Sequence, residues 1–176
     1  MGFIVLGLFA GTLTSTQGAL IQMVNHGLST GALFLLVGVI YDRRHTRMIE
    51  DFGGLAAVMP LYTGAFMIST LASIGLPGLN GFVGEFLILT GAFPHYPTAV
   101  VLAATGIVLG AVYMLSLVQR VFWNSLRHEE NRTLQDLTWQ EVLAFAPMGT
   151  LMVWIGVHPG TFLSLSEAAV RRLIGG

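Results

Sequence analysis

The sequence contains no cysteine and no lysine, and only 10% of its residues are charged. Without cysteine the chain can form no disulfide bond, no thiolate nucleophile and no cysteine-ligated metal or iron–sulfur cluster. The formal net charge is −1 and every basic residue is an arginine, so there is no basic stripe to bind nucleic acid. No residue cluster has metal-ligand spacing, and no serine–histidine–acid pattern indicates a hydrolase.

Apolar residues make up 54% of the 176 residues and come in long blocks, which gives a mean hydropathy of +0.75. Long apolar blocks between short charged loops predict an all-α, polytopic transmembrane helix bundle, here a single membrane domain over residues 1–176. The first block, residues 1–11, is about half as long as a membrane span requires and lacks the basic start of a signal peptide. We expect it to be a partial helix, the end of a span that begins in a longer chain.

Four complete spans are expected at about 18–41, 60–93, 98–123 and 142–157, followed by a short amphipathic tail at 164–173. As one straight helix, the 60–93 segment would be about 50 Å long, against about 30 Å of hydrocarbon. The stretch "GLPGLNG" predicts a break near 75–81, because proline removes a backbone donor and glycine leaves helical geometry readily. The residues expected to form this break are Gly75, Pro77, Gly78 and Gly81.

The break allows either one discontinuous crossing or two short helices that double back. Six of the eight arginines lie in two loops, at Arg43, Arg44 and Arg47 and at Arg120, Arg127 and Arg132, while the "PHYP" turn between them has none and Arg171 and Arg172 lie near the C-terminus. Because positive loops stay on the cytoplasmic side, the distribution favours a single discontinuous crossing that leaves both arginine loops cytoplasmic. The C-terminus is then expected on the outer, periplasmic side of a bacterial inner membrane.

Glu85 lies inside the 60–93 span, a few residues after the break. An ionisable group at membrane depth is costly unless it is hydrated or paired, and it usually marks an ion or proton pathway. The alternative is a neutral glutamic acid that donates one hydrogen bond to a neighbouring helix. The adjacent broken helix is a second sign of a transport site and favours the pathway.

His26 lies in the middle of the 18–41 span, and helical spacing places it on one face with Gln22, Asn25, Ser29 and Thr30. An imidazole can take and release protons near neutral pH within such a polar chain. The alternative is a packing stripe of small and polar residues. Thr105 and Tyr113 align on the 98–123 span and are weaker candidates for the same polar axis, since hydroxyl residues commonly join membrane helices.

The stretches "MVNHGLSTGALFLLVGVIYDRRHTR" and "STLASIGLPGLNGFVGEFLILTGAF" closely resemble the chain M family of the proton-pumping NADH-quinone oxidoreductase, respiratory complex I, known in mitochondria as subunit 4. The resemblance covers essentially the whole chain and corresponds to the last third of a fourteen-helix subunit. It implies an antiporter-like fold, with His26 on a central hydrophilic axis and Glu85 as the ionisable residue of the outer half-channel. Related subunits usually carry lysine where this chain has Glu85, which points to chain M.

The resemblance also implies the partners: other membrane subunits of complex I, the lipid bilayer, protons and water. It implies no quinone, flavin, iron–sulfur or other cofactor in this chain, whose contribution to the enzyme would be the proton channel. The family's proton-input residues would lie upstream of Met1. Two other interpretations stay open, a subunit of a multisubunit cation/proton antiporter or membrane-bound hydrogenase, and a non-transporting membrane scaffold.

Overall fold

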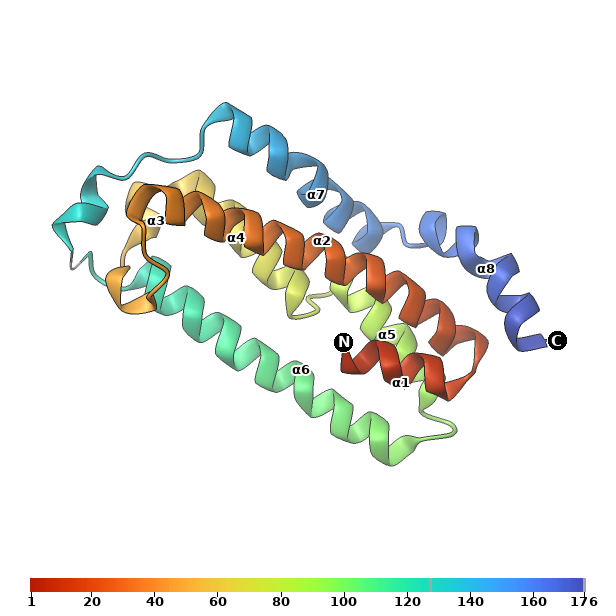
Figure 1. The fold of residues 1–176 in the computed structure, drawn as a ribbon. Coiled ribbons are helices and arrows are strands. Elements are labelled where there is room, and N and C mark those ends of the chain that lie inside the picture. The colour runs from red at the N-terminus through yellow and green to blue at the C-terminus, as the bar shows by residue number, and fades with distance from the viewer. Residues whose placement is uncertain (127, 176) are drawn as a thin grey trace.

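The computed structural model describes residues 1–126 and 128–175, which form helices and connections without a strand. The main helices are α1 (Gly2–Ala10), α2 (Leu13–Arg44), α3 (Leu55–Val58), α4 (Pro60–Ser73), α5 (Asn80–Ala92), α6 (Pro97–Val118), α7 (Trp139–Val157) and α8 (Gly160–Gly175). Short elements in the connections are η1 (Ile49–Asp51), η2 (Gln119–Trp123) and η3 (Glu129–Thr133). Figure 1 shows α2, α6, α7 and the α4–α5 pair running along one common direction, which confirms the predicted helix bundle.

Three of the described helices are long and apolar enough to cross a membrane: α2, α6 continued through η2 to Trp123, and α7. They cover the segments expected at 18–41, 98–123 and 142–157, with wider bounds. The segment expected at 60–93 is divided into α4 and α5, each about 20 Å long at 1.5 Å per residue, so neither can span the bilayer alone. Helix α8 is longer than the tail expected at 164–173.

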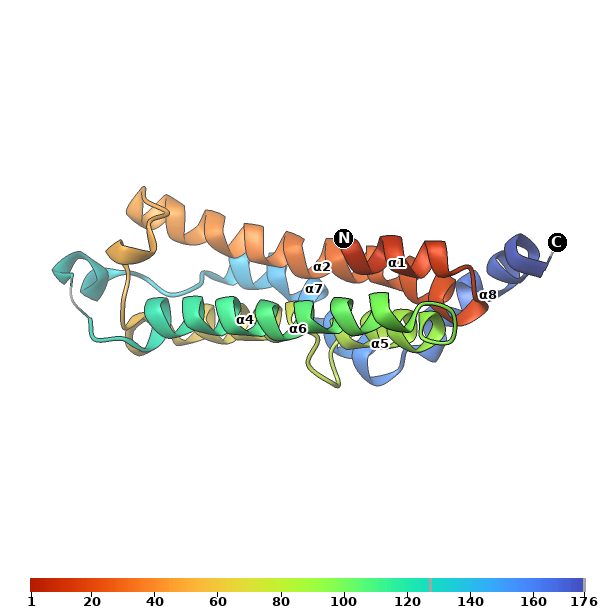
Figure 2. The same ribbon diagram turned by 90° about the horizontal axis from the view of Figure 1, so that it is seen from below.

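Helices α4 and α5 follow one another in the same direction, with residues 74–79 between them (Figures 1 and 2). Gly75 and Gly78 have φ angles of 76° and 94°, a left-handed conformation that favours glycine, and Pro77 between them has no N–H to donate. The predicted discontinuous helix is therefore confirmed. The break is shorter than expected, because α5 resumes at Asn80 and Gly81 lies in its first turn rather than in the break.

The connection from α2 to α4 and the connection from η2 to α7 lie at the same end of the bundle (Figure 1). Arg43, in the last turn of α2, forms an ion pair with Glu141 at 2.8 Å and donates to the carbonyl oxygen of Asp136 at 3.1 Å. The Asp136 carboxylate accepts from the backbone N–H groups of Leu61 and Tyr62, at 2.8 and 2.9 Å, and so caps α4. Arg127 lies outside the described residues.

The apolar core occupies the half of the bundle near these connections. It joins α2, α4, α7 and η2 through buried side chains such as Leu36, Tyr62, Phe122 and Met152. Large apolar side chains also cover the outer surface, for example Phe34, Leu102, Leu109 and Leu143. An exposed apolar surface of this kind is suited to lipid or to neighbouring membrane helices.

Glycines allow α5 to pack closely against its neighbours. A Cβ at Gly84 would overlap the side chain of Gln22 on α2, and a Cβ at Gly81 would fall on the carbonyl oxygen of Ala72 at the end of α4. The Thr12 hydroxyl also donates to the carbonyl oxygen of Gly91 at 3.0 Å. Small residues at such contacts let helix backbones approach within a membrane.

This packing predicts that Gly81→Ala destabilises the protein while Gly64→Ala does not. The new methyl group at position 81 meets the backbone of Ala72, whereas a Cβ at Gly64 on α4 has nothing within 4 Å. Overpacking of this kind lowers the free energy of unfolding by about 1–3 kcal/mol. Replacing glycine with alanine at an open helical site raises it by about 1 kcal/mol or less. Thermal unfolding in detergent measures both, and equal melting temperatures for the two variants would contradict the prediction.

Candidate functional site

A polar cavity of about 340 Å³ lies beside the helix break, between α1, α2, the α4–α5 break and α6. Its polar lining consists of Gln22, His26, Ser73, Glu85 and Tyr113. Four of these residues were predicted as site residues from the sequence, and they come from three different helices. Gly106 and Gly110 of α6 line the opposite wall, where the lack of side chains leaves the space open.

Glu85 is 9% exposed and lies in the second turn of α5. Its carboxylate lies directly against Gly75 in the break, where a Cβ would come within 2.5 Å of a carboxylate oxygen. Gly75 therefore provides both the left-handed backbone of the break and the space that the Glu85 carboxylate occupies. The break and the carboxylate form one structural unit.

His26 is exposed along α2 and lies on the wall of the same cavity. Its ring nitrogen Nδ1 lies 3.3 Å from the Thr30 hydroxyl, one helical turn away. This contact orients the ring, and the hydrogen-bond roles depend on which nitrogen carries the proton. Thr30 thus belongs to the site through His26 rather than through the cavity itself.

A second, smaller cavity of about 20 Å³ adjoins the first. Gln22, His26 and Ser73 line both cavities, while Asn25, Ser29, Ala72 and Gly81 line the smaller one alone. Asn25 and Ser29 are buried. The polar stripe expected along α2 therefore separates into an exposed edge facing the large cavity and a buried edge facing the break.

Thr105 does not join this group. Its side chain is exposed and its hydroxyl donates to the carbonyl oxygen of Leu102 at 2.6 Å, on its own helix. The reason is the orientation of α6, whose buried side chains are Val100, Met114 and Val118. Helical spacing alone did not indicate which face of α6 turns inward.

Asn80 was missed as a site residue. It is fully buried at the start of α5, and its side-chain nitrogen Nδ2 donates to the carbonyl oxygen of Asn25 at 3.3 Å. Its position was an available signal, because Asn80 follows the glycine–proline break and begins the half-helix that carries Glu85. Gly106 and Gly110, four residues apart on α6, were a second missed signal.

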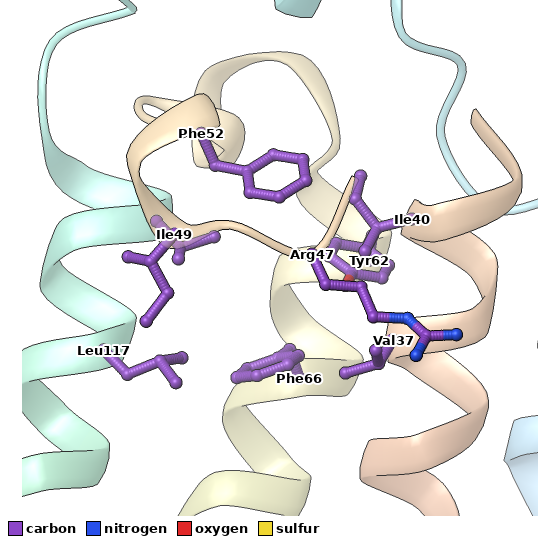
Figure 3. A pocket seen from close by; sticks show the side chains of 9 residues that line it. Val37, Ile40, Arg47, Ile49, Phe52, Tyr62, Phe66 and Leu117 are labelled. Carbon is purple, nitrogen blue, oxygen red and sulfur yellow. The ribbon is translucent and has the colours of Figure 1, made fainter. Parts of the chain in front are cut away.

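A third cavity, of about 100 Å³, lies at the end of the bundle with the arginine loops, and its lining is largely apolar. Figure 3 shows Phe52 and Phe66 on its walls and the Arg47 guanidinium beside α2. That guanidinium lies 4.5 Å from the ring centroid of Tyr41, and the Tyr62 hydroxyl donates to the carbonyl oxygen of Leu36 at 3.1 Å. Its polar groups are thus engaged elsewhere.

The large cavity brings together side chains that can exchange protons. A carboxylate, an imidazole, a phenol and a hydroxyl share one space with room for water. Among the described residues, no three histidine or acidic side chains gather into a group that could hold a metal ion. The arrangement can therefore take up and release protons along water-bridged side chains.

A family profile described as "NADH:quinone oxidoreductase/Mrp antiporter, TM" matches residues 1–110, more than half of the chain. The chain belongs to this family. Within the family, NADH-quinone oxidoreductase subunit M of Rhodobacter capsulatus is 43% identical over 174 residues, which are 99% of this chain and 34% of that protein. The chain thus spans about a third of the length of the curated relatives it matches. The predicted resemblance to chain M is confirmed.

Two solved structures support the fold. A chain of respiratory complex I from Thermus thermophilus with bound NADH matches with a TM-score of 0.88 and 37% identity, over the whole of this chain and 38% of that chain. A chain of the Mrp complex from Dietzia sp. DQ12-45-1b matches with a TM-score of 0.84 over 98% of this chain and 40% of that chain. Its identity is 20%, so it shows the fold alone.

The geometry predicts that position 85 is reached by water and position 88 is not. Glu85 lines the polar cavity, whereas Ile88, one turn further along α5, is fully buried against Ile4 and Ala19. In a background free of other cysteines, Glu85→Cys should react with a small hydrophilic thiol reagent at least about tenfold faster than Ile88→Cys, because thiolates form in water. Equal labelling rates would show that the cavity is not hydrated.

Proposed function

We propose that the chain forms part of a membrane subunit of the proton-translocating NADH-quinone oxidoreductase and contributes the outer half of a proton channel. The observation that carries this proposal is the polar cavity in which Glu85 and His26 face the break of a discontinuous helix. A carboxylate at membrane depth needs hydration, and irregular backbone there is tolerated where it lines a wet cavity. In this chain both features occur at one place, because Glu85 and Ile74 of the break line the same polar cavity.

In this proposal Glu85 is the titrating group of the half-channel. His26 passes protons between the two cavities, because it lines both. Gln22, Ser73 and Tyr113 complete a path that runs through water, and their side chains fix where that water can lie. The reduction of quinone by NADH takes place in other subunits of the complex, and this part of the chain binds no redox cofactor.

We place the chain in the inner membrane of a bacterium, as a multi-pass segment in contact with other membrane subunits and with lipid. Because both arginine-bearing connections lie at one end, the positive-inside rule puts that end in the cytoplasm. Glu85, on α5, then lies in the half of the discontinuous helix nearer the periplasm, and the C-terminus is periplasmic. This location is the reason for assigning Glu85 to the outer half-channel.

The rival functions explain less. An antiporter subunit would share the fold, but the identity to the Mrp chain is 20%, against 43% to subunit M from R. capsulatus. A scaffold would need neither a buried carboxylate nor a glycine-rich break beside it. We therefore favour the oxidoreductase subunit.

The proposal predicts that Glu85→Gln assembles normally in its complex but lowers proton pumping per assembled complex at least severalfold. Glutamine keeps the shape and hydrogen bonding of glutamate but cannot titrate. Glu85→Asp keeps the proton with a shorter reach and should retain part of the pumping. Acidification by inverted membrane vesicles during NADH oxidation, normalised to assembled complex, measures both variants.

Glu167→Gln is the matched control, because this exposed glutamate of α8 pairs with Arg171 one turn away. It should pump at the wild-type rate. In the same assay, His26→Ala should lower pumping more than assembly, while His95→Ala, in an exposed turn, should not. Wild-type pumping by Glu85→Gln in assembled complex would refute the proposal, since the carboxylate would then serve only as a neutral hydrogen-bonding group.

The orientation is tested by single cysteines at exposed positions in the connections. Met48 and Glu129 lie in the two arginine-bearing connections, and His95 lies in the turn at the opposite end. A membrane-impermeant thiol reagent should label the first two from the cytoplasmic side and the third from the periplasmic side. Labelling of Met48→Cys and Glu129→Cys from opposite sides would contradict the topology.

A further inference from the structure

Two buried asparagines join α2 to the break of the discontinuous helix. Asn25 is 1% exposed and Asn80 is fully buried. The Nδ2 atom of Asn25 donates to the backbone carbonyl of Asn80 at 2.6 Å, and the Nδ2 atom of Asn80 donates to the backbone carbonyl of Asn25 at 3.3 Å. The pair is reciprocal and spans two elements that are far apart in the sequence.

These hydrogen bonds determine which way each amide points. A backbone carbonyl can only accept, so the NH₂ group of each asparagine must face it. Asn25 uses its second hydrogen on the Gln22 side-chain oxygen at 3.3 Å, and Asn80 also donates to the Ser29 hydroxyl at 3.5 Å. Each Oδ1 atom therefore faces away from the partner's backbone.

Within the described part of the chain, both Oδ1 atoms are buried without a hydrogen-bond partner. A buried carbonyl oxygen that lacks a donor is destabilising, and native proteins usually satisfy such atoms with a side chain or an ordered water. The pair thus offers two acceptors at the break and needs a donor.

The small cavity of about 20 Å³, which Asn25 lines and Asn80 does not, has room for a donor to Asn25. Asn25 lines it together with the side chains of Ser29 and Ser73, which can both donate and accept. This volume is enough for one water molecule, and such a water is held when two to four polar groups surround it. Gln22, His26 and Ser73 connect this cavity with the larger one at Glu85.

We propose that the Asn25–Asn80 pair is a positioning element of the site and that Asn25, with Ser29 and Ser73, binds one water molecule in the small cavity. This inference rests on the proposed function, which it extends from Glu85 into the break. The bound water satisfies Asn25 and continues the polar path from His26 toward α5. The pair itself holds the first residue of α5 against α2, which fixes the direction in which Glu85 projects five residues later.

The test uses Asn25→Ala, Asn80→Ala and the double variant in the assembled complex. Each single variant removes the donor to one backbone carbonyl and leaves the other hydrogen bond of the pair in place, so each should lower the amount of assembled complex. The double variant loses both donors and should assemble no better than the poorer single variant. Proton pumping per assembled complex of the double variant should be at least twofold below wild type, because the bound water and the fixed start of α5 are lost.

Ser69→Ala is the matched control. Ser69 is fully buried on α4, but its hydroxyl donates to the carbonyl oxygen of Ala65 on the same helix, at 3.0 Å. This variant should assemble and pump as the wild type does. A map of the wild-type complex at a resolution that shows waters should contain density within hydrogen-bonding distance of Asn25 in the small cavity, and the double variant should lack it.

Two outcomes would overturn the inference. Wild-type pumping by the double variant would show that the pair serves packing alone, and a wild-type map without water in the small cavity would remove the binding site. These outcomes are separate from failure of the proposed function. Glu85→Gln tests that function by pumping, whereas the water density and the loss of assembly in the asparagine variants do not depend on proton transfer.

Discussion

Backbone groups freed by a break at membrane depth must find partners within the protein, and this requirement organises the structure around residues 74–79. Some partners are local, since Leu76 and Leu79 donate to the carbonyl oxygens of Leu71 and Leu76, each at 3.0 Å. The carbonyl of Asn80 is satisfied from another helix, by Asn25. Helix α2 runs unbroken beside the interruption, and Asn25 on its polar stripe supplies this partner.

Glycine serves two opposite purposes around this break. At Gly81 and Gly84 it removes side chains so that α5 can touch the end of α4 and the side chain of Gln22. At Gly106 and Gly110 on α6 it removes side chains where nothing fills the space, and the polar cavity results. Glu85 thus lies between a tightly packed wall and an open wall. A carboxylate in that position is held in place on one side and is accessible to water on the other.

The sequence predicted those features that depend on one segment alone. Glu85 and the "GLPGLNG" break stood out against an apolar run, and helical spacing grouped His26 with Gln22. Features that depend on how helices pack could not be predicted in this way. Thr105 has the right spacing but lies on the outward face of α6, and the contact between Asn25 and Asn80 joins residues 55 positions apart. The break also ends earlier than predicted. A glycine in such a stretch suggests irregular backbone, but Gly81 packs closely against Ala72 and lies in the first turn of α5.

The short lengths of α4 and α5, 14 and 13 residues, also affect how the chain enters the membrane. The insertion machinery selects segments by hydrophobic length, and neither half reaches the roughly 20 residues of an ordinary span. The two halves must therefore be inserted together, and the carbonyl of Asn80 at the start of α5 finds its donor only when α2 is already present. Because α2 precedes them in the chain, it can leave the ribosome and insert first. The order of elements in the gene thus matches the order in which the bilayer can accept them.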